Sequence, residues 1–337
     1  MKKIRIGIIG PSEIAFRRFL PALAKSDDFF FLGVAVASKS EWMSGDSNVP
    51  DDVESLILAE KEKATKFQMF FGGEIYDSYE QLLKRDDIDA VYVPLPPLLH
   101  FHWGKLVLEN NKHLLLEKPF TTSEKDSVTL NTLAQQKNLA THENFAFVFH
   151  KQLTVINDLV AEIGDIRLIR TSFGFPYRGA NDFRYSKTLG GGALLDCGGY
   201  PIKLASFFLG DQCHVMTSHL HSSRNHNVDV YGSATLASPE KEYVAQISFG
   251  MDNYYKCDLE IWGSHGVIYA PRVFTPTAEM ETKIDLALKT TEVVNVSPDD
   301  QFLHSLEHFG KCILNSKTRI NNYKIINTQA RLMGEVK

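Results

Sequence analysis

The sequence has few cysteines, no strong excess of charge and no long apolar segment. Its 337 residues include four cysteines, far apart and without a C-x-x-C pair, which argues against a disulfide framework or a metal site. The formal net charge is -5, and the absence of a basic stripe argues against nucleic acid as a partner. No apolar run approaches the roughly 18 residues that span a bilayer. These absences predict a cytoplasmic protein that works without nucleic acid, membrane or metal.

The composition is otherwise that of a globular protein, with 44% hydrophobic and 23% charged residues. Single hydrophobic cores usually stop growing at about 250–300 residues. We therefore expect two domains.

The amino-terminal part alternates between short apolar runs and amphipathic stretches. This alternation predicts parallel strands joined by helices, and so a doubly wound sheet of the Rossmann type. The expected strands are 4–9, 30–37, 88–93 and 112–116, the expected helices lie near 14–25, 53–66, 78–84 and 100–110, and a polar loop is expected at 45–52.

The first strand is followed by Gly10-Pro11-Ser12-Glu13-Ile14-Ala15. A dinucleotide-binding fold places its glycine-rich turn at this point, so that backbone amides and a helix N-terminus face a pyrophosphate. Gly10, Ser12, Glu13 and Ile14 are therefore candidate cofactor contacts. The alternative is an ordinary strand–turn–helix in which Ser12 caps the helix.

The second strand ends at Ser38-Lys39. An acid there would bond the adenosine ribose, whereas a cation with hydroxyls suits a 2′-phosphate. No Asp or Glu stands at this strand end in the sequence, so we expect NADP(H), with NAD(H) as the alternative. The alternative that Lys39 is a solvated lysine of a loop remains open.

Two further strand ends carry candidate residues. Pro94 and Leu95 follow one strand, and His100 in the next helix is expected near a nicotinamide ribose. Glu117-Lys118-Pro119 follows the other strand, and ligands bind beyond the carboxyl ends of parallel strands. The alternatives are a structural histidine and a surface ion pair.

The carboxyl-terminal part changes character after Pro119. Helices are expected at 123–138, 151–163 and 193–209, strands at 139–147, 166–175, 214–222, 229–237, 243–249, 257–262 and 266–269, and a last helix at 299–315 before a polar tail. The strands alternate in polarity, which predicts a large, open, mainly antiparallel sheet. Asp196 and Tyr200 are four residues apart and share a helical face.

Several motifs occur in one order: Gly7-Ile8-Ile9-Gly10, Glu117-Lys118-Pro119 and Gly190-Gly191-Gly192-Ala193-Leu194-Leu195-Asp196. This set resembles the glucose–fructose oxidoreductase, inositol dehydrogenase and rhizopine-catabolism (Gfo/Idh/MocA) family, and most of all its dihydrodiol and xylose dehydrogenase and sugar ketoreductase branch. The resemblance implies an NAD(P)-binding Rossmann domain, taken as 1–120, and a substrate-binding and oligomerisation domain, 121–337. It also implies a homodimer or a dimer of dimers.

The resemblance further implies a hydride transfer between a nicotinamide and a hydroxyl or keto carbon of a sugar, with Lys118, Asp196 and Tyr200 as catalytic residues. A free phenol, with a pKa around 10, is a weak base at neutral pH, and a neighbouring ammonium favours phenolate. The alternatives are a helix-start carboxylate for Asp196 and a packing tyrosine for Tyr200. A non-catalytic dinucleotide or sugar sensor of the same fold also remains open.

Substrate contacts are expected from Lys118, Asp196 and Tyr200, and from Asn144 and the loop arginines Arg178 and Arg184. Arginine forks suit phosphates and carboxylates. We therefore hypothesise a charged sugar, such as a nucleotide-linked one. The alternative is two solvated loop arginines.

Overall fold

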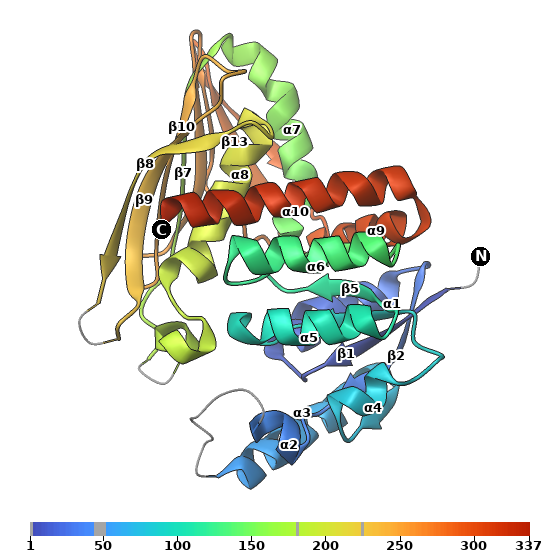
Figure 1. The fold of residues 1–337 in the computed structure, drawn as a ribbon. Helices are drawn as coiled ribbons and strands as arrows, with labels where there is room; N and C mark the ends of the chain where they lie inside the picture. The colour runs from blue at the N-terminus through green and yellow to red at the C-terminus, as the bar shows by residue number, and fades with distance from the viewer. Residues whose placement is uncertain (1–2, 44–51, 180–181, 224–225) are drawn as a thin grey trace. The chain divides into compact units, whose positions relative to one another are not determined.

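The computed structural model describes residues 3–43, 52–179, 182–223 and 226–337. The expected polar loop 45–52, apart from Asp52, lies outside these ranges, as do residues 180–181 of the arginine-bearing loop. The chain forms two compact units, each built on one sheet (Figure 1). The first unit comprises residues 1–121, 125–144 and 305–326, and the second comprises 122–124, 145–304 and 327–337.

The first unit contains a six-stranded parallel sheet in the order β3-β2-β1-β4-β5-β6. The expected doubly wound parallel sheet is therefore confirmed, with its strand order reversing between β1 and β4, where such folds bind ligands. Its strands are β1 (Ile4–Ile9), β2 (Phe29–Ala35), β3 (Glu74–Tyr76), β4 (Ala90–Val93), β5 (His113–Leu116) and β6 (Thr141–Glu143). The strand expected at 139–147 is thus reduced to three residues.

Helices follow most of these strands: a π-helical turn (Ala15–Phe19) with α1 (Leu20–Lys25), α2 (Lys39–Met43), α3 (Val53–Phe71), α4 (Tyr79–Leu83), α5 (Pro97–Glu109) and α6 (Glu124–Gln136). The helix α5 begins three residues before its expected start. A proline at the first helical position has no N–H to leave unpaired and a fixed helical φ, so Pro97 starts this helix.

The second unit contains an eight-stranded sheet in the order β14-β13-β12-β11-β7-β10-β9-β8, with β7 and β10 parallel and the other neighbours antiparallel. The expected open, mainly antiparallel sheet is confirmed. Its strands are β7 (Ile166–Gly174), β8 (His214–Ser222), β9 (Asp229–Ala237), β10 (Val244–Gly250), β11 (Lys256–Gly263), β12 (Val267–Ala270), β13 (Thr282–Ala287) and β14 (Thr291–Val296). The last two were not expected; half of the residues of β14 are polar.

The helical segments of this unit are a 3-10 turn (Ala146–Phe149), α7 (Lys151–Leu159) with a 3-10 turn (Val160–Ile163), two short turns (Phe183–Tyr185 and Lys187–Leu189), and a π-helical turn (Leu194–Gly198) leading into α8 (Gly199–Leu209). The helix α8 packs on β7 and β10. The faces of β7 and β10 that carry Ile169, Phe173 and Ile247 belong to the buried core of this unit.

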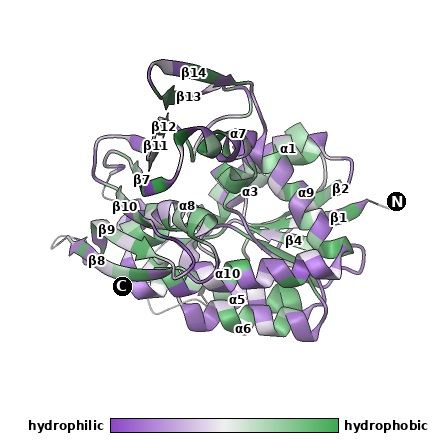
Figure 2. Ribbon diagram, turned by 90° about the horizontal axis from the view of Figure 1, so that it is seen from above, coloured by the Kyte–Doolittle hydropathy of each residue, from purple (hydrophilic) through white to green (hydrophobic). Residues whose placement is uncertain are grey.

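The polar tail expected after the last helix forms a further helix, which was not expected. After α9 (Gln301–Leu314) the chain forms a long helix, α10 (Ser316–Val336), on which hydrophobic and hydrophilic residues intermingle (Figure 2). A sparse apolar stripe is enough to hold it, because Tyr323, Ile326 and Leu332 are almost fully buried. Among the described residues, no helix combines the length and the apolar character that crossing a bilayer requires.

Candidate active site

The turn after β1 depends on a glycine. Gly10 has a φ of +88°, and a Cβ there would come within 2.5 Å of the Leu95 Cδ2 atom. The Ser12 hydroxyl accepts the Ala15 N–H at 3.2 Å, so Ser12 caps the helix start. The amides of Glu13 and Ile14, in the first turn, have no acceptor within the helix. Both side chains are exposed, and this arrangement fits the pyrophosphate of a dinucleotide.

Ser38 and Lys39, after β2, are already bonded to acids. Ser38 donates its N–H and its hydroxyl to one oxygen of Glu41, at 2.7 and 2.9 Å. The Lys39 ammonium lies 3.2 Å from a carboxylate oxygen of Glu54, and both side chains are exposed. A 2′-phosphate can take the Ser38 donors only by exchanging with Glu41, whereas the Lys39 ammonium has further N–H donors to offer.

A third acid also reaches this strand end. The Glu60 carboxylate, on α3, accepts the Ala37 N–H at 3.0 Å, and burial raises its pKa. The sequence shows no acid at the end of β2, but Glu41 arrives there from α2, and Glu54 and Glu60 arrive from α3. Glu41 follows Ser38 at the S-x-x-E spacing of a capping box and so had a local signal, whereas Glu60 lies 23 residues along the chain from Ala37 and had none.

His100 is fully buried. Its Nδ1 lies 2.7 Å from the Pro119 carbonyl oxygen and its Nε2 lies 2.7 Å from the Leu95 carbonyl oxygen. Burial, which disfavours the charged imidazolium, lowers its pKa. Because both ring nitrogens face carbonyl oxygens, neither is available for the expected contact with a nicotinamide ribose. His100 instead joins the segment after β4 to the segment after β5.

Lys118 is partly buried at the end of β5, followed by a cis peptide bond to Pro119. The neighbouring Glu117 turns its carboxylate into the first unit. One oxygen accepts the Tyr92 hydroxyl at 2.6 Å and the Asn144 amide at 2.7 Å, and the other accepts the Lys118 N–H at 3.3 Å. The side chains of Glu117 and Asn144, expected at ligand contacts, are therefore engaged inside the protein.

In the second unit, the glycine run precedes the helix that carries Asp196. A Cβ on Gly191 would lie 2.4 Å from the Arg184 carbonyl oxygen, and one on Gly192, whose φ is +123°, would lie 2.3 Å from an Asp229 carboxylate oxygen. That carboxylate accepts the Leu194 N–H at 2.6 Å. The glycines thus allow the loop and β9 to approach the helix start closely.

This approach pairs Arg184 with Asp196. The Arg184 Nε donates to an Asp196 oxygen at 2.7 Å, and its Nη1 lies 3.1 Å from Asp182. Burial alone would lower the pKa of Arg184, but the two acids outweigh it and the pKa is raised. Arg178 is exposed and lies over the Phe175 ring, 4.7 Å from its centroid. The two arginines therefore have different surroundings, one paired with acids and one open.

Tyr200 is half-buried in a cluster of aromatic rings. Four phenylalanine rings surround its ring, with centroid distances of 5.2, 5.8, 4.9 and 5.6 Å for Phe145, Phe147, Phe173 and Phe274. The Tyr200 ring therefore packs among apolar side chains, as an amphipathic tyrosine does when only its hydroxyl serves a polar group.

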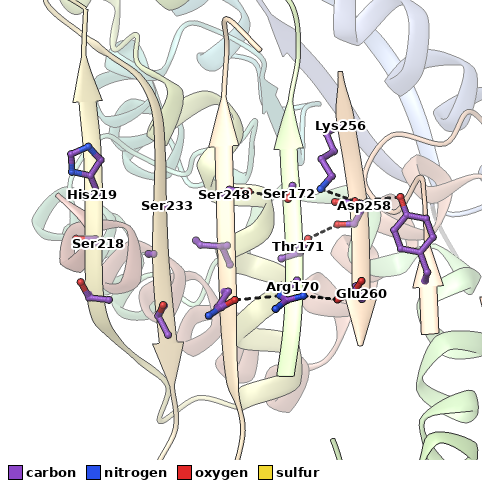
Figure 3. A pocket seen from close by; sticks show the side chains of 16 residues that line it. Arg170, Thr171, Ser172, Ser218, His219, Ser233, Ser248, Lys256, Asp258 and Glu260 are labelled. Atoms are coloured by element: carbon purple, nitrogen blue, oxygen red, sulfur yellow. Dashed lines mark hydrogen bonds and ion pairs between the residues drawn. The ribbon is translucent and has the colours of Figure 1, made fainter. Parts of the chain in front are cut away.

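The opposite face of the eight-stranded sheet is polar. Arg170 and Ser172 alternate along β7 with the buried Ile169 and Phe173. They line an open hollow of about 620 Å³ with polar side chains of neighbouring strands, among them the Glu260 carboxylate, 3.2 Å from Arg170 (Figure 3).

Sequence reasoning missed the residues that support the site from elsewhere in the chain. Asp182 could have been found, because an Asp two residues before a bonded amide is a common capping pattern, and it accepts the Arg184 N–H at 3.0 Å. Tyr92 and Asp229 gave no such signal. The described residues contain no cluster of three or more His, Cys, Asp or Glu side chains placed to hold a metal.

Comparison with known proteins gives consistent matches over both units. Residues 4–145 match an oxidoreductase family with an NAD-binding Rossmann fold, and residues 156–269 match the GFO/IDH/MocA C-terminal domain. A dTDP-3,4-didehydro-2,6-dideoxy-alpha-D-glucose 3-reductase of Saccharopolyspora spinosa is 37% identical over 315 residues, 93% of this chain and 88% of the relative. D-xylose 1-dehydrogenase (NADP(+)) 2 of Haloferax volcanii is 28% identical over 319 residues, 93% of this chain and 90% of the relative.

A solved 3-ketoreductase from Actinomadura kijaniata, in complex with NADP and TDP-benzene, superposes with a TM-score of 0.87 at 35% identity, covering 99% of this chain and 97% of that chain. The fold and these matches define a dinucleotide-dependent oxidoreductase. The chain belongs to the Gfo/Idh/MocA oxidoreductase family, and the resemblance inferred from its motifs is confirmed.

Proposed function

We propose that this protein is an NADPH-dependent ketoreductase that acts on a keto group of a sugar, in particular a nucleotide-linked deoxysugar. The observation that carries the proposal is the likeness over nearly the whole chain to dTDP-sugar 3-reductases and to a 3-ketoreductase in complex with NADP. The first unit provides the cofactor-binding turn at Gly10, and we assign sugar binding to the second unit. NAD(H) is the alternative cofactor.

NADPH, when bound, supplies the hydride that reduces the carbonyl carbon. In our proposal Tyr200 donates a proton to the carbonyl oxygen as it gains negative charge, and Lys118 stabilises the phenolate that remains. Asp196, held by Arg184 at 2.7 Å, orients the sugar. The aromatic rings around Tyr200 exclude water from the developing charge. Arg178, the more open of the two arginines, is the candidate contact for a nucleotide phosphate.

We also propose a homodimer in the cytoplasm. The polar outer face of the eight-stranded sheet supports the pairing, since the resemblance implies that these sheets associate. All four cysteines are free and buried in the structure, which agrees with a reducing compartment.

The test is to mix the purified protein with NADPH and follow its fluorescence, then to add dTDP-linked 3-keto sugars and follow loss of absorbance by the reduced nicotinamide. We expect tight binding of NADPH and turnover with at least one such sugar. Binding of NADPH without oxidation by any keto sugar, nucleotide-linked or free, would favour the sensor alternative.

A further inference from the structure

A chain of buried hydrogen bonds in the first unit leads to the strand end that carries Lys118. The Ser305 hydroxyl, on α9, donates to the Asn144 Oδ1 at 2.9 Å, and the His142 Nε2 lies 2.9 Å from the same hydroxyl. The Asn144 Nδ2 donates to Glu117 at 2.7 Å. Exposed fractions of His142, Asn144 and Ser305 are 1%, 5% and 2%, so water does not replace these bonds.

The direction of each bond follows from Glu117. A carboxylate only accepts hydrogen bonds, so the Asn144 amide must point its Nδ2 toward Glu117 and its Oδ1 toward Ser305. The one Ser305 proton is then used on Asn144, and Ser305 must accept from His142. The Nε2 of His142 therefore carries a proton. The whole chain donates toward Glu117, which also accepts the Tyr92 hydroxyl at 2.6 Å.

The participants come from distant parts of the sequence. The first unit's second segment ends at Asn144 and its third begins at Ser305, so one bond joins the ends of two segments of this unit. Buried hydrogen bonds of this kind resist distortion, because a broken one leaves its partner unsatisfied in a low-dielectric interior.

We propose that Ser305 is a positioning residue: through Asn144 it holds the Glu117 carboxylate, and through Glu117 it fixes the strand end that presents Lys118. The inference rests on the catalytic role proposed for Lys118. Small displacements of a reacting group lower the rate steeply, whereas binding of substrate and cofactor depends on other contacts.

The test compares Ser305→Ala with a matched control, Ser127→Ala. Ser127 is 0% exposed in the same unit and its hydroxyl lies 2.7 Å from the Thr121 hydroxyl. We expect Ser305→Ala to lower kcat roughly ten- to a hundredfold, with KM for the keto sugar and Kd for NADPH changed by less than about twofold. Ser127→Ala should keep kcat within about twofold of the wild type.

A second measurement, hydrogen exchange, does not depend on turnover. The Lys118 N–H donates to Glu117 at 3.3 Å, so its hydrogen exchange in the cofactor-free protein should quicken in Ser305→Ala and stay unchanged in Ser127→Ala. Tyr92→Phe, which removes another donor to Glu117 and leaves no cavity, should act in the same direction. It replaces Ser305→Ala if that variant does not fold.

The double variant Lys118→Met with Ser305→Ala separates the inference from the proposed function. If Ser305 acts through Lys118, it should lower kcat no further in the Lys118→Met background. Full turnover of Lys118→Met would refute the catalytic role proposed for Lys118, and the inference with it, while leaving the ketoreductase activity standing. A large loss in Lys118→Met, with wild-type kcat in Ser305→Ala or with losses that simply multiply, would overturn the inference alone.

Discussion

The two sheets differ in how their faces are buried. In the first unit, β4 is buried along its whole length and β1 and β5 nearly so, because helices joining parallel strands lie on both faces of such a sheet. In the second unit, β9 and β10 alternate between buried and half-buried or exposed residues. One face packs on α8 and the other stays polar.

From this difference we expect the two units to have different roles. A sheet buried on both faces can present ligand-binding groups only at its strand ends, where Gly10, Ser38 and Lys118 lie. A sheet buried on one face has a second face to spare for association. Substitutions in the first unit should therefore change cofactor recognition. Substitutions in α8 should change the reaction on the sugar, and substitutions on the open face should change assembly. The predictions below test that division, from the largest expected change in free energy to the smallest.

The largest effect should come from Tyr200→Phe. Loss of the proton donor should lower turnover roughly 10²–10⁴-fold, since general acid catalysis contributes that much, and leave the Kd for NADPH nearly unchanged. Lys118→Met should also slow turnover and move the basic limb of the pH–rate profile upward. Steady-state kinetics and fluorescence titration measure both. Turnover of Tyr200→Phe within about threefold of wild type, or a raised KM alone, would make Lys118 itself the acid.

The next effect concerns acid stability of the first unit. His113, on β5, accepts the Ala140 N–H at 2.9 Å, and burial lowers its pKa to about 4. Unfolded histidine titrates near 6.5, so between these values the unfolded chain binds a proton that the folded chain refuses, and stability falls as pH drops. At pH 5 the loss from this group is about 2 kcal/mol.

His113→Asn, which keeps an acceptor but does not titrate, should reduce that loss. The measurement is urea unfolding at pH 7.5 and pH 5, followed by the fluorescence of Trp103, a buried residue of the first unit. His221→Asn, at an exposed position of β8, is the control and should retain the wild-type pH dependence. An equal loss in wild type and His113→Asn would contradict the prediction.

Cofactor choice should show a smaller effect. We expect NADPH to bind at least tenfold more tightly than NADH, about 1.4 kcal/mol, and Lys39→Glu to abolish that preference. Paired titrations with both cofactors give the ratio. Lys61→Glu changes an exposed α3 lysine that pairs with Asp77 at 3.0 Å, and it should leave the ratio intact. Equal affinities in the wild type would show that Glu41 and Glu54 keep Ser38 and Lys39 from a 2′-phosphate.

The smallest effect should be on assembly. Arg170→Glu places a like charge beside Glu260 on the open face of β7, and one exposed pair is worth up to about 1 kcal/mol. The dimer should dissociate roughly fivefold more readily, as light scattering over a dilution series would measure. Arg167→Glu, on the same strand but paired with Asp165, should behave as wild type. A wild-type monomer at micromolar concentration would refute the dimer.

Much of the fold could be predicted from the sequence. The bounds expected for β1, β8 and β9 agree with those in the structure. The strand β1 is a short apolar run that ends at a turn, and β9 alternates between buried and more exposed residues, and both patterns are typical of strands. The strand–turn–helix at Gly10 and the helix carrying Asp196 and Tyr200 could be predicted for the same reason. Their turn and capping residues lie next to the elements they terminate.

The partners of the polar side chains were decided by tertiary structure. The sequence predicted Asn144 and Arg184 as substrate contacts, and in the structure each is bonded to an acid of the protein. Ser305 meets Asn144 across 161 residues of sequence, and α10 is held by a few buried side chains in a mostly polar stretch. Hydrophobic periodicity is a pattern among residues that are close in the sequence. A buried hydrogen bond needs a complementary group from wherever the folded chain brings one, and neither partner's neighbours in sequence carry a sign of it.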